Sequence, residues 1–167
     1  TKYTTEELPE LGVPKQLHHL PEICFAIGQA YLQSGRIEDA IDWLKKGYDN
    51  ENGEFEDVKS AYASALLQRL YEKKHIAIGK QLNNDDRKEL ELIDQLFSNV
   101  WNCAKEKESI ALNIGSVTNL LLTKFLLNDI DSAISIAKEA IEKNGNDEQL
   151  LKHATFLALD AGKFSEA

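Results

Sequence analysis

The prolines of this chain are confined to its beginning. They are Pro9, Pro14 and Pro21, and no proline follows them. A proline inside a helix costs about 3 kcal/mol, so a long proline-free stretch is compatible with continuous helices. Pro21 suits the first position of a helix, where its missing N–H has no partner to lose. Residues 1–20 are therefore predicted to form an irregular N-terminal arm, and residues 21–167 a helical domain.

Apolar residues after Pro21 recur at spacings of three and four, the period of a helix that buries one face. The first such stripe ends at Ser34-Gly35 and the second begins at Ile37. Further helices are expected within 110–127, 130–143 and 148–161. Runs of alternating apolar and polar residues, which would indicate strands, are not sustained. The sequence predicts an all-α fold of antiparallel helix pairs joined by short turns.

Composition narrows the possible partners and compartments. The chain has 28 acidic and 19 basic residues, a formal net charge of −9, which disfavours binding to nucleic-acid phosphates. The longest apolar stretch is far too short to span a membrane. Cys24 and Cys103 are too few for a disulfide framework, so we expect a cytoplasmic protein. The chain contains no methionine, even at position 1, which suggests a piece of a longer protein.

Three short segments share one pattern. Each begins with a glycine or asparagine, which tolerate a left-handed backbone and so end a helix. A large apolar residue follows two positions later, and an alanine three positions after that. The alanine is small enough to let two helices approach closely. The segments are Gly35 to Ala40, Asn128 to Ala133 and Gly162 to Ala167. The interval from Ala133 to Ala167 matches the period of a known class of helical repeat.

The first repeat carries a fuller motif. Cys24-x2-Ile27-Gly28-x2-Tyr31, followed by Ala40-x3-Leu44, resembles the W-x2-L-G-x2-Y and A-x3-F pattern of tetratricopeptide repeats. The resemblance covers residues 21–167 and implies a right-handed α-solenoid of about three and a half repeats. Its repeats would be 21–54, 55–113, 114–147 and a truncated 148–167. Among the departures, Cys24, Leu44 and Gly47 keep a small or apolar role, whereas Asn52 replaces the closing proline.

The second repeat is enlarged. It covers 55–113, whereas the repeats on either side cover only 21–54 and 114–147. The surplus is centred on Lys73 to Lys88, where it is expected to lengthen both helices. Gly79 and the cluster Asn83 to Asp86 would form the tip. One interpretation is an exposed insertion that is simply tolerated. The other is a docking or dimer contact made by Ile76, Ile78 and Leu82.

Catalytic or metal-binding patterns are not recognisable in this sequence. The histidines are isolated or, at His18 and His19, adjacent and therefore divergent on a helix, so no metal or cofactor is expected. Cys24 and Cys103 fall on apolar faces and are interpreted as inert core thiols. Acidic pairs such as Glu38-Asp39 occur at helix starts, where they favour the helix dipole. We therefore expect a protein that is not an enzyme.

The resemblance to tetratricopeptide repeats implies a concave wall built from the first helix of each repeat, where family members usually hold peptides. Helical geometry selects candidate residues one turn apart on the face away from the partner helix. Leu122 and Phe125 also suit ordinary core positions, whereas Phe25 and Phe156 suit exposed anchors. The candidates are Glu22, Phe25, Gln29, Lys59, Ala63, Thr118, Leu122, Phe125, Lys152 and Phe156.

One subgroup of the family grips a peptide carboxylate with lysines, asparagines and an arginine. The positions that match these residues here carry no positive charge, so that clamp is not expected. They are Phe25, Gln29, Ser60, Gly115 and Asn119.

Three functions therefore stay open. The chain could be a protein–protein interaction module, a structural spacer or dimerisation segment, or the substrate-presenting arm of a larger enzyme such as a glycosyltransferase or signalling protein. The truncated last repeat also leaves apolar residues such as Leu150, Leu151 and Phe164 without a neighbour. We therefore expect fraying of the last helix or self-association through it.

Overall fold

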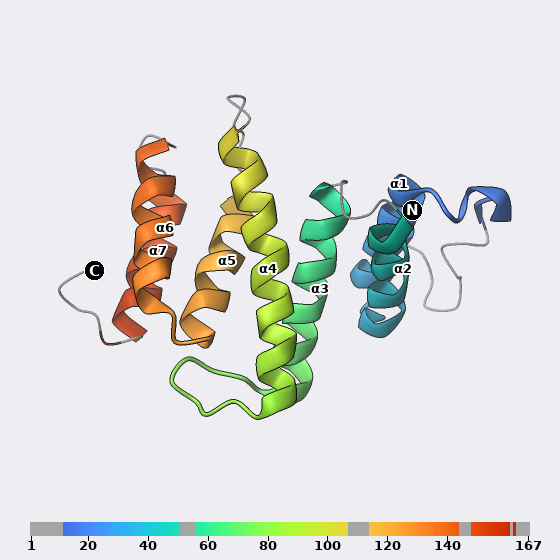
Figure 1. The fold of residues 1–167 in the computed structure, drawn as a ribbon. Coiled ribbons are helices and arrows are strands. Elements are labelled where there is room, and N and C mark those ends of the chain that lie inside the picture. The colour runs from blue at the N-terminus through green and yellow to red at the C-terminus, as the bar shows by residue number, and fades with distance from the viewer. Residues whose placement is uncertain (1–11, 51–55, 107–113, 144–147, 161, 163–167) are drawn as a thin grey trace. The chain divides into compact units, whose positions relative to one another are not determined.

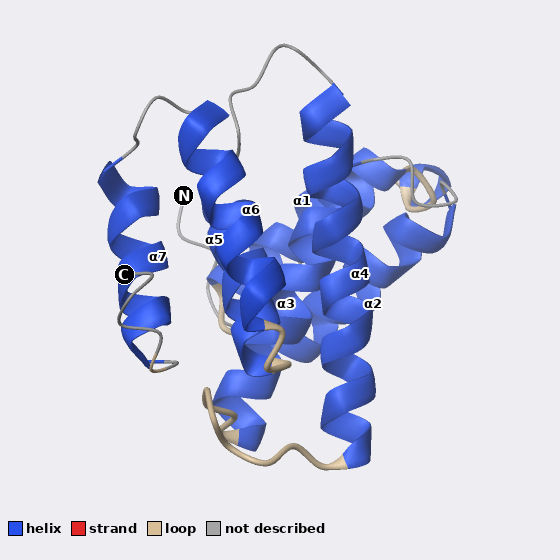
Figure 2. Cartoon of the chain, turned by 60° about the vertical axis from the view of Figure 1, so that its left-hand side comes forward, coloured by secondary structure: helices blue, strands red, loops and turns tan. Residues whose placement is uncertain are grey.

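A computed structural model describes residues 12–50, 56–106, 114–143, 148–160 and 162. Throughout these ranges the regular secondary structure is helical (Figure 2), which confirms the predicted all-α class. The chain forms two compact units, Thr1–Arg69 and Leu70–Ala167. We refer to them as the N-terminal and C-terminal units.

The N-terminal unit is built on a helical hairpin of α1 (Pro21–Gln33) and α2 (Ile37–Asn50), which pack side by side (Figure 1). Pro21 is the first residue of α1, as expected. The two helices approach closely at Gly28, where an added Cβ would lie 2.6 Å from the Cγ atom of Leu44. Leu44 is fully buried. Glycine at position 28 therefore makes room for the leucine of the facing helix.

Residues 12–20 of the predicted arm pack on the hairpin. The arm contains one 3₁₀ turn, η2 (Lys15–Leu17). The ring of His18 meets the edge of the Trp43 ring on α2, with 5.2 Å between the ring centroids. The thiol of Cys24 on α1 donates a hydrogen bond of 3.3 Å to the carbonyl of His18. These contacts join the end of the arm to both helices of the first hairpin.

Helix α3 (Glu56–Lys74) begins in the N-terminal unit and ends in the C-terminal unit. Within the N-terminal unit it contacts α2 through Tyr48 and Tyr62, whose ring centroids are 5.8 Å apart. An ion pair of 3.2 Å also joins Arg69 to Glu38. The first part of α3 is therefore tied to the preceding hairpin.

The C-terminal unit contains α4 (Asn84–Glu106), α5 (Ile114–Leu126), α6 (Ile130–Lys143) and α7 (Glu148–Asp160). Helix α5 packs against α4, α6 and α7, and α6 also packs against α7. Helices α3 and α4 have 19 and 23 residues, whereas α1, α5 and α7 have 13 each. The expected lengthening of both helices in the second repeat is confirmed.

The start of α4 is capped as its sequence predicts. The side-chain oxygen of Asn83 accepts a hydrogen bond of 2.8 Å from the backbone N–H of Asp86. The side-chain amide of Asn83 donates back to the carboxylate of Asp86 at 2.6 Å. Lys74, at the end of α3, lies 3.4 Å from the same carboxylate. The connection between the two long helices is therefore closed at its base by a cap and an ion pair.

The repeat is visible in the helix boundaries themselves. Helix α2 follows α1 at the same interval as α6 follows α5, and α1, α5 and α7 are equal in length. The residue two positions after each of these first helices has a positive φ angle, as the shared pattern predicts: Gly35, Asn128 and Gly162. Ala40 and Ala133 are both fully buried. The third member of the alanine set, Ala167, lies outside the described residues.

The two complete hairpins fill their crossing points in opposite ways. Position 28 on α1 is a glycine that faces the leucine at position 44 on α2. The equivalent positions of the later hairpin hold Leu121 on α5 and Ala137 on α6, both buried. In the first hairpin the large side chain is on the second helix, whereas in the later hairpin the large side chain is on the first helix and the small one is on the second. Each pair thus combines one large and one small side chain, and the later pair is larger by one methyl group.

Candidate functional site

The candidate site is the exposed side of the first helices, because their other sides are used for packing. In the C-terminal unit this side can be followed across α5 and α7, which contact each other. Their exposed and half-buried residues fall at equivalent positions of the repeat, so they lie on one face. We call this set the α5–α7 row; it consists of Gly115, Thr118, Asn119 and Leu122 on α5, and Lys152, His153 and Phe156 on α7.

Phe156 is the most exposed large apolar side chain of the described residues, with 65% of its surface accessible. Its equivalent on α5 is Leu122, which is half-buried. One turn earlier on each helix lie Thr118 and Lys152, which are also equivalent to each other. The row therefore offers an apolar side chain on each of two contacting helices, with the charged Lys152 one turn before Phe156, whereas the hydroxyl of Thr118 is buried. Phe156 is thus exposed, and its role as an anchor stays a prediction.

In the N-terminal unit the predicted residues on α1 are accessible to different degrees. Glu22 is exposed, whereas Phe25 and Gln29 are half-buried. Phe25 is thus a less prominent anchor than the sequence suggested.

The predicted groove residues on α3 are wrong. Lys59 and Ala63 have 7% and 0% of their surface accessible, so neither can be reached by a partner. Apolar and small residues occur around most of the circumference of α3, which leaves a narrow outward strip instead of a face. That strip contains Ser60 and Ser64, each one position after a predicted residue and half-buried. Ser60, Ser64 and Gln68 share a spacing of four, but the charged residues elsewhere on α3, including the buried Lys59, obscure this polar strip in the sequence.

Two further candidates are corrected for the same reason. Phe125 on α5 has 3% of its surface accessible, so it belongs to the core, the alternative left open for it. Ile76, proposed for insertion docking, has 6% of its surface accessible and is therefore buried. Ile78 and Leu82 are half-buried, and their role in docking stays a prediction.

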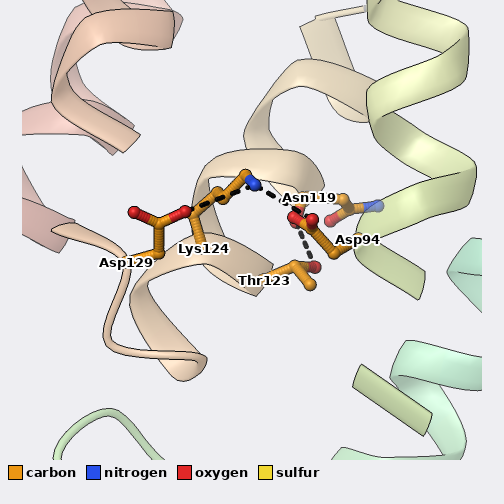
Figure 3. Close-up of polar contacts among 5 residues, drawn as sticks. All are labelled: Asp94, Asn119, Thr123, Lys124 and Asp129. Carbon is orange, nitrogen blue, oxygen red and sulfur yellow. Dashed lines mark hydrogen bonds and ion pairs between the residues drawn. The ribbon is translucent and has the colours of Figure 1, made fainter. Parts of the chain in front are cut away.

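A lysine beneath the row holds three elements together (Figure 3). The ammonium of Lys124 on α5 lies 2.9 Å from a carboxylate oxygen of Asp94 on α4, and 3.4 Å from Asp129 in the turn before α6. Beside it, the buried hydroxyl of Thr123 donates a hydrogen bond of 2.7 Å to the carbonyl of Asn119. The other carboxylate oxygen of Asp94 is buried and has no hydrogen-bond partner among the described residues.

Neighbouring charges and hydrogen bonds shift the pKa values of Lys124 and Asp129. Burial would lower the pKa of Lys124, but its hydrogen bond to Asp94 and the two nearby carboxylates outweigh burial and raise it. Burial would raise the pKa of Asp129, but hydrogen bonds from Ser132 and the charge of Lys124 outweigh that effect and lower it. Lys124 and Asp129 are therefore both held in their charged forms, as a structural ion cluster requires.

Comparison with known proteins bears on the first hairpin. Residues 21–52 match the family model described as tetratricopeptide repeat. This segment is therefore similar to a tetratricopeptide repeat. This match spans α1 and α2 and contains the motif from Cys24 to Leu44. No curated protein and no solved structure matches the chain.

The later hairpin shares the geometry of the tetratricopeptide repeat without the full motif. Its helices begin and end where those of the first repeat predict, yet Leu121 and Lys124 replace Gly28 and Tyr31. The matched repeat and the equivalent helix boundaries together show an all-α helical repeat protein.

The cysteines and the other candidates for chemistry are accounted for by packing. Cys24 is fully buried, and this burial raises the pKa of its thiol, which makes it a poor nucleophile. Cys103 is a half-buried free thiol. Within the described ranges, no three His, Cys, Asp or Glu residues are grouped so that they could hold a metal ion. In the same ranges, no helix is both long enough and apolar enough to cross a bilayer.

Proposed function

We propose that this chain is a non-catalytic interaction module and that it binds a peptide or protein segment on the α5–α7 row. The observation that carries this proposal is the 65% exposure of Phe156 on α7, a helix that contacts α5, where the equivalent residue is the half-buried Leu122. Apolar side chains of this size are mostly buried in folded proteins, and an exposed aromatic residue is a common anchor of a binding interface. The tetratricopeptide repeat at residues 21–52 supports a protein-interaction role in general terms.

The rigidity of α5, one of the two helices that carry the row, favours binding over mere exposure. Helix α5 is fixed by three neighbouring helices and by the ion pair between Lys124 and Asp94. Leu122 is therefore presented on a support that does not have to become ordered when a partner binds. Binding to a preorganised surface loses less conformational entropy than binding to a loop. The unpaired thiols of Cys24 and Cys103 are compatible with the reducing cytoplasm as its compartment.

A second candidate function is self-association through α7, and one observation favours it. Leu151 has 38% of its surface accessible, whereas the equivalent residue on α5, Val117, has 3%. On α7 the side that would face a following repeat is therefore apolar and open at Leu151. The side chains of Leu150 and Phe164, also expected to lack a neighbour, lie outside the described residues.

Sedimentation velocity of the wild-type chain and of Leu151→Lys tests this second candidate. A dimer that Leu151→Lys dissolves would support it, and a wild-type monomer at all concentrations would contradict it.

Binding to the row can be tested without knowing the natural partner. Phage-displayed random peptides of about 12 residues, which span roughly 40 Å when extended, are selected against the chain. Binding of each enriched clone is then measured on Phe156→Ser and on Leu92→Ser. Leu92 is the matched control, because it is an apolar residue on α4 with 38% of its surface accessible.

We expect Phe156→Ser to weaken the enriched clones by about tenfold or more, as the loss of an aromatic anchor does. Leu92→Ser should change their binding by less than about twofold. Circular dichroism verifies that both variants keep their helices. Enriched clones that bind Phe156→Ser as well as wild type would refute the role of the row.

A further inference from the structure

The α5–α7 row differs in charge from the rest of the chain. Its residues include Lys152 and His153 but no aspartate or glutamate. The chain as a whole has a formal net charge of −9. In the same unit, exposed acidic side chains lie on other helices, for example Glu91 on α4 and Glu142 on α6, and on α7 at Glu148, one turn before Lys152. Because Lys152 offsets Glu148, the face that carries the exposed phenylalanine is close to neutral on an acidic protein.

Acidic side chains beneath and beside the row are already engaged. Asp94 and Asp129 are paired with Lys124 beneath it. Glu148, one turn before Lys152 on α7, lies 2.6 Å from the ammonium of Lys152. A carboxylate that approaches Lys152 from a partner would therefore compete with a side chain of the same helix.

We propose that the partner segment carries an acidic side chain next to its apolar anchor, so that its carboxylate takes the place of Glu148 on Lys152 while the anchor packs against Phe156 and Leu122. This inference rests on the proposed function of the row. The side chains of Glu148 and Lys152 are 80% and 63% exposed, and an exposed pair of this spacing is weak and easily exchanged. Exchange for an acidic partner retains the ion pair and adds apolar contact.

The geometry of the row fixes the spacing of the two groups in the partner. Lys152 and Phe156 are one helical turn apart, so their Cβ atoms are about 6 Å apart. In an extended segment, residues i and i+2 are roughly 7 Å apart and point to the same side. The carboxylate should therefore lie two positions from the apolar anchor in an extended partner, or three to four positions from it in a helical one.

The test uses the enriched clones that depend on Phe156, synthesised as fluorescent peptides, with fluorescence polarisation as the assay. Glu148→Gln frees Lys152 and should strengthen binding about two- to fivefold. Glu142→Gln, which makes the same charge change on α6, should alter binding by less than about 1.5-fold. Lys152→Glu should weaken binding by about five- to tenfold. Replacing the peptide aspartate or glutamate by its amide should abolish the effect of Glu148→Gln.

The outcomes separate this inference from the function on which it rests. Clones that depend on Phe156 but carry no acidic residue at these spacings, or do not respond to Glu148→Gln, would overturn the inference and leave the binding face in place. Equal strengthening by Glu148→Gln and Glu142→Gln would also overturn it, because the effect would then come from net charge. A selection without any clone that depends on Phe156 would overturn both.

Discussion

The crossing of α1 and α2 at Gly28 permits a quantitative test of how the repeat packs. In Gly28→Ala, the new Cβ would lie 2.6 Å from the Cγ atom of Leu44 and 2.8 Å from its Cδ2 atom. Carbon atoms in favourable contact are about 3.5–4.0 Å apart. Because Cγ is the branch point of a fully buried side chain, the conflict cannot be relieved by moving a flexible end, and the two helices must separate.

Two effects of opposite sign decide the magnitude of this change. Overpacking of a close-packed crossing costs about 1–3 kcal/mol. Replacing glycine by alanine within a helix gains about 1 kcal/mol. With a contact as short as 2.6 Å the strain should be at its upper end, so we expect Gly28→Ala to destabilise the N-terminal unit by about 1–2 kcal/mol.

A double-mutant cycle with Leu44→Ala tests whether the clash with Leu44 causes this destabilisation. Leu44→Ala alone should cost about 2–5 kcal/mol. In that background the clash is gone, so Gly28→Ala should become stabilising by about 1 kcal/mol, which gives a coupling free energy of about 2–3 kcal/mol. Gly47→Ala is the control, because its Cβ would lie 2.8 Å from the Cβ atom of Cys24 and Leu44→Ala should not rescue it.

Native-state hydrogen exchange of the amides in residues 21–50 is the appropriate measurement, because it reports on this hairpin separately from the C-terminal unit. Equal effects of Gly28→Ala in the wild-type and Leu44→Ala backgrounds would show that the crossing is not limited by volume. So would stabilisation by Gly28→Ala alone.

Three further predictions concern the C-terminal unit. The lowered pKa of Asp129 means that its stabilisation is present above its ordinary value of 3.8 and is lost as the pH falls through the lower value of the folded state. Lowering the pH from about 5 to about 3 should therefore reduce the free energy of unfolding, measured in urea, more for wild type than for Asp129→Asn. The difference should be about 0.5–1 kcal/mol for this partly exposed group, and parallel curves of unfolding free energy against pH would contradict the prediction. Lys124→Met leaves the carboxylate of Asp94 without its lysine partner and should lower the free energy of unfolding in urea by about 2–3 kcal/mol. Adding Asp94→Asn should recover most of this loss, and a loss that is not recovered would argue against the ion pair. Asn83→Ala removes the cap of α4 and should cost about 1 kcal/mol, seen as faster exchange in residues 84–90, whereas unchanged exchange there would argue against the cap.

The turns and crossings of the repeat were predictable because they depend on local residue types. Gly35 and Asn128 end their helices with positive φ angles, and Ala40 and Ala133 are buried at the crossings. These are requirements of backbone conformation and side-chain size at single positions, so they can be inferred from spacing alone.

The exposed side of α3 was not predictable from spacing, because it depends on what surrounds the helix. Periodicity identifies one buried face when the opposite face is clearly polar. On α3, Lys59 and Ala63 are buried as well as the expected stripe, which leaves Ser60 and Ser64 as the outward positions. A helix covered on several sides gives no strong amphipathic signal, and the choice of outward strip then depends on its neighbours.

The ion cluster at Lys124 was missed for a different reason. Lys124 occupies the position of Tyr31 in the first repeat, where the pattern favours an aromatic core residue. Its partner Asp94 lies 30 residues away on a helix of the enlarged repeat. A pairing between charges so distant in sequence has no local signature, and only the fold brings them together.

The reversed pairs at the two helix crossings bear on how such repeats are detected. Gly28 with Leu44 and Leu121 with Ala137 each place one large and one small side chain at equivalent positions of a hairpin, yet a profile that scores each position separately penalises the second pair at both places. A profile that scored the combined size of the two facing residues would treat the hairpins as equals. Divergent helical repeats would then become detectable in sequences where only their best-conforming member is found today.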